Sequence, residues 1–333
     1  MPARPTAFRF LVLLPVVVVV VAATTLLGPS WIPWSEIFAA DEPSYIFWHL
    51  RVPRALLAAC AGAGLAVGGV VFQTLFRNPL AEPYTLGIAS GASLGAAIGF
   101  LAGWRGGAAA QAPPLTLLAF AGALAAMGVV YALSRLRRGR DMARLLLAGV
   151  CVAYMCSAGI LLVFFLADRA ITNDIVTWMM GSLSTLRPRA ALEIAVVLLP
   201  VLLLAAGGHR ALDLLTFGDD WAAARGVRVG WTIWSCYAAV GLLTAVIVAN
   251  CGPIGFVGLM VPHIGRALFG VRTLPLLLGS LLIGAAFLSV CDGIARLLPV
   301  TELPVGVVTN ILGAAFFFYL LATRPIAHTP VRP

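Results

Sequence analysis

The sequence contains no lysine and few charged residues of any kind. All 22 basic residues are arginine, 13 residues are acidic, and charged residues make up 11% of the 333-residue chain. Soluble domains carry roughly 25% charged residues. Since 61% of the residues are hydrophobic and the mean hydropathy is +1.01, the sequence predicts an integral membrane protein. We expect a single transmembrane domain over residues 1–333.

Other absences narrow the class of protein. The six cysteines form no Cys-x-x-Cys pair, and no His, Cys or acidic residues have the spacing of metal ligands, so we predict no metal site. The glycine-rich phosphate loop is absent, and no Ser-His-Asp or paired-carboxylate arrangement indicates hydrolysis. The arginines are spread over short loops without interleaved aromatic residues, which disfavours nucleic acid. We therefore expect no catalytic residue and no cofactor bound by this chain.

Long apolar stretches divide the chain into ten segments. About 20 predominantly apolar residues are needed to cross a bilayer, and proline, glycine and charge clusters mark the cuts. The segments cover 8–27, 54–76, 84–103, 115–134, 142–167, 190–207, 231–250, 254–270, 274–298 and 305–322. The predicted fold class is an all-α polytopic membrane protein with about ten transmembrane helices.

The distribution of arginine predicts the orientation in the membrane. With the N-terminus inside, fifteen of the 22 arginines lie in inner loops and tails, including the cluster at 135–140. Loops on the cytoplasmic side carry such an excess. An even number of spans returns the C-terminus to the same side, so we expect both termini in the cytoplasm.

Residues 77–92 contain a polar turn broken by two prolines, which separates the second and third segments. It cannot lie against lipid, where every backbone polar group must be paired within the protein. A second Gly/Pro-interrupted stretch, residues 250–263, follows the seventh segment. Residues 78–86 and 250–263 would occupy matching positions in inverted repeats made of helices 2–5 and 7–10, with a translocation path between them. Chance similarity among glycine-rich spans is the alternative.

Glycine recurs every four residues in the third segment, at Gly87, Gly91, Gly95 and Gly99. In a membrane such a stripe lets another helix approach closely. The second segment is also rich in glycine, so we expect both helices in the protein interior.

The inner loop at about 209–230 favours two short amphipathic helices separated by Gly218. Asp219 and Asp220 would begin the second helix, where the helix dipole favours acids. Leu212, Leu215 and Trp221 would be exposed to a soluble partner docking from the cytoplasm. A membrane-surface helix without a partner fits the composition equally well.

An amphipathic stretch on the outer side, residues 168–184, would form one short helix as a lid or vestibule wall. Met179 and Met180 would line the path of a bulky, partly apolar solute, although ordinary packing also explains methionine.

Acidic residues fall near the segment ends, which leaves no obvious carrier for a proton or sodium relay. Asp292 and Arg296 lie one helical turn apart, and this spacing predicts a simple ion pair between them.

Several long motifs resemble a known family over residues 8–322. The motifs are Arg51-Val-Pro-Arg54, Gln73-x-Leu-Phe-x-Asn-Pro-Leu-Ala81, Trp178-Met-Met-Gly-Ser-Leu183, Gly252-Pro-Ile-Gly-Phe-Val-Gly-Leu-Met-Val-Pro-His263 with Arg266, and Glu302-Leu-Pro-Val-Gly-Val-Val-Thr309. They are similar to those of the permease subunits of type II ABC importers for iron-siderophores, haem and vitamin B12.

The resemblance implies a homodimer in the bacterial inner membrane with one pore between its subunits. It also implies two cytoplasmic ATPase subunits, which bind ATP and Mg, and a periplasmic substrate-binding protein. Segments five and ten would line the pore. Carried over residue by residue, the cytoplasmic gate is Asn78, Pro79 and Leu80, and the pore or vestibule includes Trp178, Met179, Met180 and Ser182. The ATPase-coupling residues are Leu212, Leu215, Gly218, Asp219, Asp220, Ala222, Arg225 and Gly226.

Two positions depart from the family pattern. Ala315 stands where many members have proline, and Arg225 stands where leucine is common before Gly226. The first concerns the shape of the last helix, and the second concerns the docking of the ATPase.

The function expected from the sequence is therefore that of the permease subunit of an ATP-driven importer, which moves a bulky metal chelate inward by alternating access. The alternative is a secondary transporter that works alone on an ion gradient.

Overall fold

Helices account for all the regular structure in the computed structural model, which describes residues 6–28, 32–33, 35–38, 42–103, 113–135, 142–184, 187, 189–297 and 302–323. A helix pairs its backbone hydrogen bonds within one segment, as the interior of a bilayer requires. The all-α fold predicted from the sequence is confirmed. The arginines at 4, 137–140, 324 and 332, which contribute to the predicted orientation, lie outside the described residues.

Ten helices correspond to the ten predicted apolar segments. They are α1 (Thr6–Leu26), α3 (Val52–Leu75), α4 (Ile88–Leu101), α5 (Pro113–Arg135), α6 (Met142–Leu166), α8 (Ala190–Gly207), α11 (Val229–Cys251), α12 (Val257–Phe269), α13 (Thr273–Arg296) and α14 (Val305–Thr323). Eight helical spans of the described chain are long and apolar enough to cross a membrane, and α4 and α12 are shorter. These two short helices follow the two Gly/Pro-interrupted stretches.

Short elements connect the long helices. Helix α2 (Glu42–Ile46) and the π-helical turn η1 (Phe47–Arg51) lead into α3, and the 3-10 turn η2 (Pro83–Leu86) precedes α4. Helix α7 (Arg169–Met179) follows α6 as predicted. The predicted pair of helices around Gly218 is also present, as α9 (His209–Leu215) and α10 (Asp219–Ala224).

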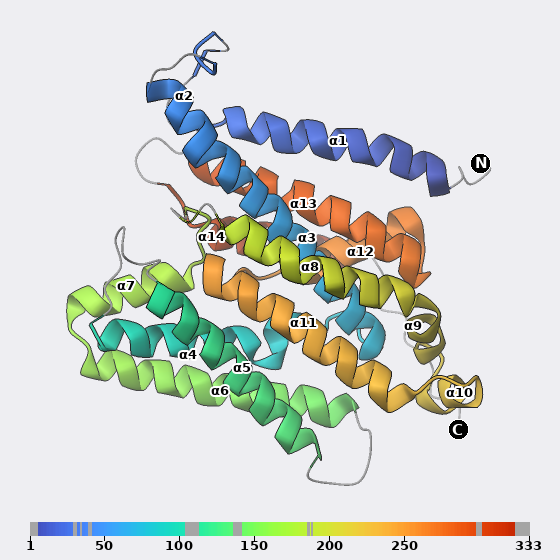
Figure 1. The fold of residues 1–333 in the computed structure, drawn as a ribbon. Coiled ribbons are helices and arrows are strands. Elements are labelled where there is room, and N and C mark those ends of the chain that lie inside the picture. The colour runs from blue at the N-terminus through green and yellow to red at the C-terminus, as the bar shows by residue number, and fades with distance from the viewer. Residues whose placement is uncertain are drawn as a thin grey trace.

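Helix α3 lies at the centre of the molecule and is buried over most of its length (Figure 1). It packs against α13, α12, α11 and α8. A Cβ at Gly62 would lie 2.2 Å from the carbonyl oxygen of Gly284, so the backbones of α3 and α13 touch there. Close contact of this kind through glycine replaces hydrophobic driving force between helices in lipid.

The packing follows the predicted repeats. Helix α4 packs on α5 and α6, and the equivalent helix α12 packs on α13 and α14. Helix α3 packs on α12 and α13, and its equivalent α11 packs on α4 and α5. Gly64 faces Ile247 and Gly68 faces Val240, so α3 and α11 run antiparallel, as inverted halves require.

The glycine stripe of α4 faces α5. A Cβ at Gly91 would lie 2.5 Å from the carbonyl oxygen of Gly122, and one at Gly95 would lie 2.2 Å from that of Leu118. The prediction that these glycines admit a close neighbour is confirmed at both positions.

Candidate functional site

Helix α3 ends in a tight turn that presents the predicted gate residues. The N–H of Asn78 donates to the carbonyl of Gln73 (3.3 Å) and that of Arg77 to the carbonyl of Thr74 (3.3 Å). This is the Schellman pattern, which requires a left-handed residue after the C-cap and usually has glycine there. Here the residue is Arg77, with φ of 50°.

The predicted gate residues lie at the surface beyond this turn. The Asn78 side chain accepts a hydrogen bond from the N–H of Leu80 (2.9 Å), which holds the turn in shape. Pro79 and Leu80 are exposed, whereas Ala81 and Glu82 are buried. The structure thus brings Asn78, Pro79 and Leu80 together at the end of the molecule that carries α9 and α10 (Figure 1).

A polar cluster joins the end of α3 to α12. The amide of Gln73 donates to the carbonyl of Gly258 (3.0 Å), and Arg266 donates to the Gln73 side-chain oxygen (2.6 Å). The backbone at Phe256 donates to the buried carboxylate of Glu82, while burial raises the pKa of Glu82 to about 7. The two interrupted stretches of the repeats therefore contact each other directly.

The loop predicted to couple to an ATPase has one buried face. Leu212 and Leu215 are 0% and 2% exposed, and Ala222 is fully buried. The prediction that Leu212 and Leu215 are exposed to a partner is wrong, because this face of α9 packs against α3 and α13. Trp221 is 57% exposed, as predicted, and Phe217 is 75% exposed.

Polar contacts fix the loop to the membrane helices at two points. The Asp213 carboxylate accepts hydrogen bonds from the N–H (2.8 Å) and the hydroxyl (2.6 Å) of Thr273, at the start of α13. The Asp219 carboxylate forms an ion pair with Arg77 of the gate turn. Gly218 and Gly226 have φ of 126° and 84°, which allows the sharp turns on either side of α10.

The exposed side of α10 carries the remaining predicted coupling residues. Asp220 is exposed at the start of the helix, and the guanidinium of Arg225 stacks over the Trp221 ring at 4.7 Å from its centroid. This cation-π contact orders the exposed face that begins at Phe217.

A charged network that sequence analysis missed lies at the opposite end of the molecule. Asp292 is fully buried and pairs with Arg54 (2.9 Å) and Arg296 (2.9 Å), and Arg54 also pairs with Glu302 (2.7 Å). The predicted Asp292–Arg296 ion pair is present, but it forms one part of this larger network. Arg54 and Asp292 are 238 positions apart, so no local spacing indicated their contact.

Arg296 of this network and the nearby Arg51 also close the end of α1. Arg296 donates to the carbonyls of Leu27 (2.7 Å) and Thr24 (2.9 Å), and Arg51 donates to that of Leu26 (3.2 Å). The last carbonyls of a helix have no partner within the helix, and cations near them are stabilising.

The predicted vestibule residues lie where α7 meets α11 and α14. Trp178 and Met179 are partly buried against the core, and Met180 is exposed. The N–H of Ser182 donates to the carbonyl of Cys251 (2.8 Å), and Gly306 of α14 lies against the carbonyl of Met180. Packing thus accounts for Trp178 and Met179, while Met180 and Ser182 remain predicted vestibule residues.

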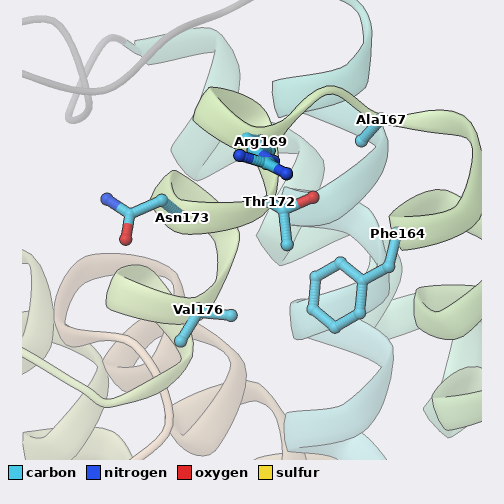
Figure 2. Close-up of a pocket in the computed structure, with 6 residues that line it drawn as sticks. All are labelled: Phe164, Ala167, Arg169, Thr172, Asn173 and Val176. Atoms are coloured by element: carbon cyan, nitrogen blue, oxygen red, sulfur yellow. The ribbon is translucent and has the colours of Figure 1, made fainter.

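An open hollow of 440 Å³ lies between the end of α6 and α7 (Figure 2). Figure 2 shows Phe164 and Ala167 on one side and Arg169, Thr172, Asn173 and Val176 of α7 on the other. In the part of the chain that the structure describes, no three His, Cys or acidic side chains come together as metal ligands would. The hollow is lined by one guanidinium, two uncharged polar side chains and three apolar ones, and four of the six lie in the stretch 168–184 that was predicted to form a lid or vestibule wall.

The antiparallel halves, the two broken segments between them and the surface loop tied to one of these segments define a polytopic membrane permease. The chain belongs to the FecCD transport family, whose model matches residues 15–323. The family recognised from its motifs is thereby confirmed.

Several relatives share most of their length with this chain. The hemin transport system permease HmuU of Yersinia pestis is 36% identical over 288 residues, which is 84% of each chain. The vitamin B12 import system permease BtuC of Escherichia coli is 36% identical over 297 residues, 88% of each chain. An inward-facing metal-chelate type ABC transporter superposes with a TM-score of 0.81 at 29% identity, over 95% of this chain and 100% of the other.

Proposed function

We propose that this chain is the permease subunit of an ATP-driven importer, and that it forms a homodimer that moves a bulky metal chelate across the bacterial inner membrane into the cytoplasm. ATP and Mg would be bound by two separate ATPase subunits, and a periplasmic binding protein would deliver the substrate. Membership of the FecCD family and the names of the relatives, which include iron chelatin, hemin and vitamin B12 permeases, support this function.

The two faces of the α9–α10 loop are the structural observation that supports the proposal most strongly. The α9–α10 loop has a buried face that fixes it to the membrane helices and an exposed face of Phe217 and Trp221. Large exposed apolar side chains beside charged ones are typical of a docking surface. The loop lies at the same end of the molecule as the turn of Asn78, Pro79 and Leu80, so docking of an ATPase and opening of the gate would occur side by side.

The mechanism that fits is alternating access. Closure of the two ATPase subunits on ATP would displace the α9–α10 loops, and the loops would shift the turns at Asn78 and thereby open or close the path between the two permease copies. A partner can shift such an equilibrium only through contacts that differ between the two states, and the α9–α10 loop is where we place this difference.

Reconstitution tests the proposal. The chain is purified with the ATPase that copurifies with it and placed in proteoliposomes with its binding protein, and uptake of haemin, cyanocobalamin and a ferric hydroxamate is measured. We expect uptake of one of these to require ATP and both partners. Gradient-driven uptake without any ATPase would contradict the proposal and establish the alternative, a secondary transporter.

The docking surface has its own test. Changing Phe217 and Trp221 together to serine should release the ATPase and abolish ATP-dependent uptake. Phe38→Ser, which alters an exposed aromatic residue at the other end of the molecule, serves as the matched control. Full retention of the ATPase by the double variant would refute the assignment of this surface.

A further inference from the structure

Arg77 and Asp219 connect the two parts of the candidate site. Their side chains form an ion pair although the residues are 142 positions apart. Arg77 follows Phe76, the C-cap of α3, and immediately precedes Asn78, while Asp219 is the first residue of α10. In the part of the chain that the structure describes, this ion pair joins the gate turn directly to the α9–α10 loop.

Arg77 occupies a position that does not suit arginine. Its φ of 50° lies in the left-handed region, where side chains with a Cβ are disfavoured and glycine is usual. The helix end would form more readily with glycine. The strained residue is therefore better explained by its side chain, whose function here is to reach Asp219, than by the needs of the turn.

The rest of the loop is fixed differently. Leu212 and Leu215 are buried, and Asp213 binds Thr273 at the start of α13. In contrast, the side chains of Arg77 and Asp219 are 38% and 27% exposed. A partly exposed ion pair can change its geometry at little cost, whereas the buried anchor at α9 persists. The loop thus has a fixed end at α9 and an end at α10 that is tied to the gate turn by an adjustable contact.

We propose that the Arg77–Asp219 ion pair transmits movement of α10 to the gate turn, and that both are positioning residues for transport. The inference rests on the proposed function. When the ATPase moves α10, the Asp219 carboxylate carries the Arg77 guanidinium with it. Because Arg77 joins the rigid end of α3 to Asn78, a change at its strained backbone redirects the turn of Asn78, Pro79 and Leu80.

The experiment exchanges the charges. Arg77→Asp and Asp219→Arg each place like charges opposite one another, and the double variant restores an ion pair in the reverse order. The three variants are made in the complete transporter, in a chain whose native cysteines have been replaced and which carries Leu80→Cys with a spin label. The measured quantities are the nucleotide-dependent change at the label, ATP-dependent uptake and copurification of the ATPase.

We expect both single variants to retain the ATPase but to lose at least ten-fold in uptake, together with the response of the label to ATP and vanadate. The double variant should regain most of both. Arg77→Gly separates the role of the side chain from folding, since it relieves the backbone and yet removes the pair; it should fold at least as well and still lose uptake. Arg77→Gln should lose uptake, whereas Arg272→Gln, at another exposed arginine, should not.

Three results would overturn the inference. The first is normal uptake by Arg77→Gly and Arg77→Asp, and the second is failure of the charge exchange to restore uptake. The third concerns the labelled transporter in which Arg77 and Asp219 are intact. It would be ATP-dependent uptake by this transporter without any response of the label at position 80. These differ from failure of the proposed function, in which the wild-type chain with its partners shows no ATP-dependent uptake.

Discussion

Asp292 supplies the buried negative charge that two arginine side chains share. Its carboxylate has no exposed surface and is the partner of the buried Arg296 and of Arg54, whose side chain is 13% exposed. Desolvating such ions is costly, and only their mutual attraction and hydrogen bonds offset this cost. The network therefore depends above all on Asp292, the fully buried carboxylate that both arginines share.

Replacing Asp292 with asparagine should destabilise the protein by about 3–5 kcal/mol, because the buried Arg296 loses its counter-charge and Arg54 keeps only the exposed Glu302. Glu302→Gln is the matched control, since Glu302 is exposed and its removal should change stability by less than about 1 kcal/mol. Thermal unfolding in detergent measures both. Equal midpoints for the two variants would show that the buried pair contributes no more than the exposed one.

Glu82 makes stability depend on pH. Burial raises the pKa of this carboxyl from 4.5 to about 7. Between these values the folded protein holds a proton that the unfolded chain releases, so stability is greatest below pH 4.5 and falls until about pH 7. The total loss is on the order of 3 kcal/mol.

Glu82→Gln keeps the acceptor for the Phe256 N–H and removes the titration. We expect its midpoint of thermal unfolding to exceed that of the wild type at pH 8 and to match it near pH 4.5. Glu42→Gln, at an exposed position, controls for the loss of one charge. If the midpoint of the wild type rises between pH 5 and 7 relative to that of Glu82→Gln, the raised pKa of Glu82 is contradicted.

At the scale of elements, glycine contacts determine which helices touch. The carbonyl of Gly284 lies where the Cβ of any other residue at position 62 would be, and the same holds between Gly69 and Gly258. Gly128 of α5 has no atom within 4 Å of the equivalent point. Replacing glycine with alanine should therefore destabilise the protein at position 62 but not at position 128.

Gly62→Ala should lower the midpoint of unfolding by forcing α3 and α13 apart, an overpacking effect of about 1–3 kcal/mol. Gly128→Ala should be neutral or slightly stabilising, since alanine favours a helix more than glycine does. Detergent melting curves of the two variants provide the comparison. A stable Gly62→Ala variant would mean that the helices separate there without penalty.

The elements themselves were predictable from the sequence, because length and hydropathy alone mark a membrane helix. All ten predicted segments have a helix within a few residues of their bounds, and the short helices after residues 86 and 256 follow the predicted breaks. The partners of the side chains were not predictable. Leu212 and Leu215 show an amphipathic face, but the pattern alone cannot tell whether this face covers the protein itself or a second one.

The link between Arg77 and Asp219 lay beyond sequence analysis for a similar reason. Both residues belong to motifs that were recognised separately, and their contact depends on how the end of α3 meets the start of α10. The network around Asp292 likewise joins α3 to α13. Contacts between helices distant in sequence are set by packing, which the periodicity of a single helix does not encode.

At the scale of the whole molecule, the exposed face of α6 determines where a path could run. Tyr154, Met155, Leu161 and Phe165 of α6 are exposed in the single chain, as are Phe318 and Tyr319 of α14. Each face must be covered by lipid or by a second copy. The proposed homodimer places α6 and α14 of both copies around one pore, so that part of α6 would meet water.

Cys151 provides a native probe of this arrangement. It lies on α6 and is exposed, whereas Cys60 is partly buried and the other four cysteines are buried. If α6 lines an aqueous path, a membrane-impermeant thiol reagent should label Cys151 in intact proteoliposomes, and Cys151→Ser should remove this labelling. Labelling only by a lipid-soluble reagent would place Cys151 against the bilayer and contradict the proposed pore. In the complete transporter the rate of labelling should also change by several-fold when ATP and vanadate are added, because alternating access opens the path to one side at a time.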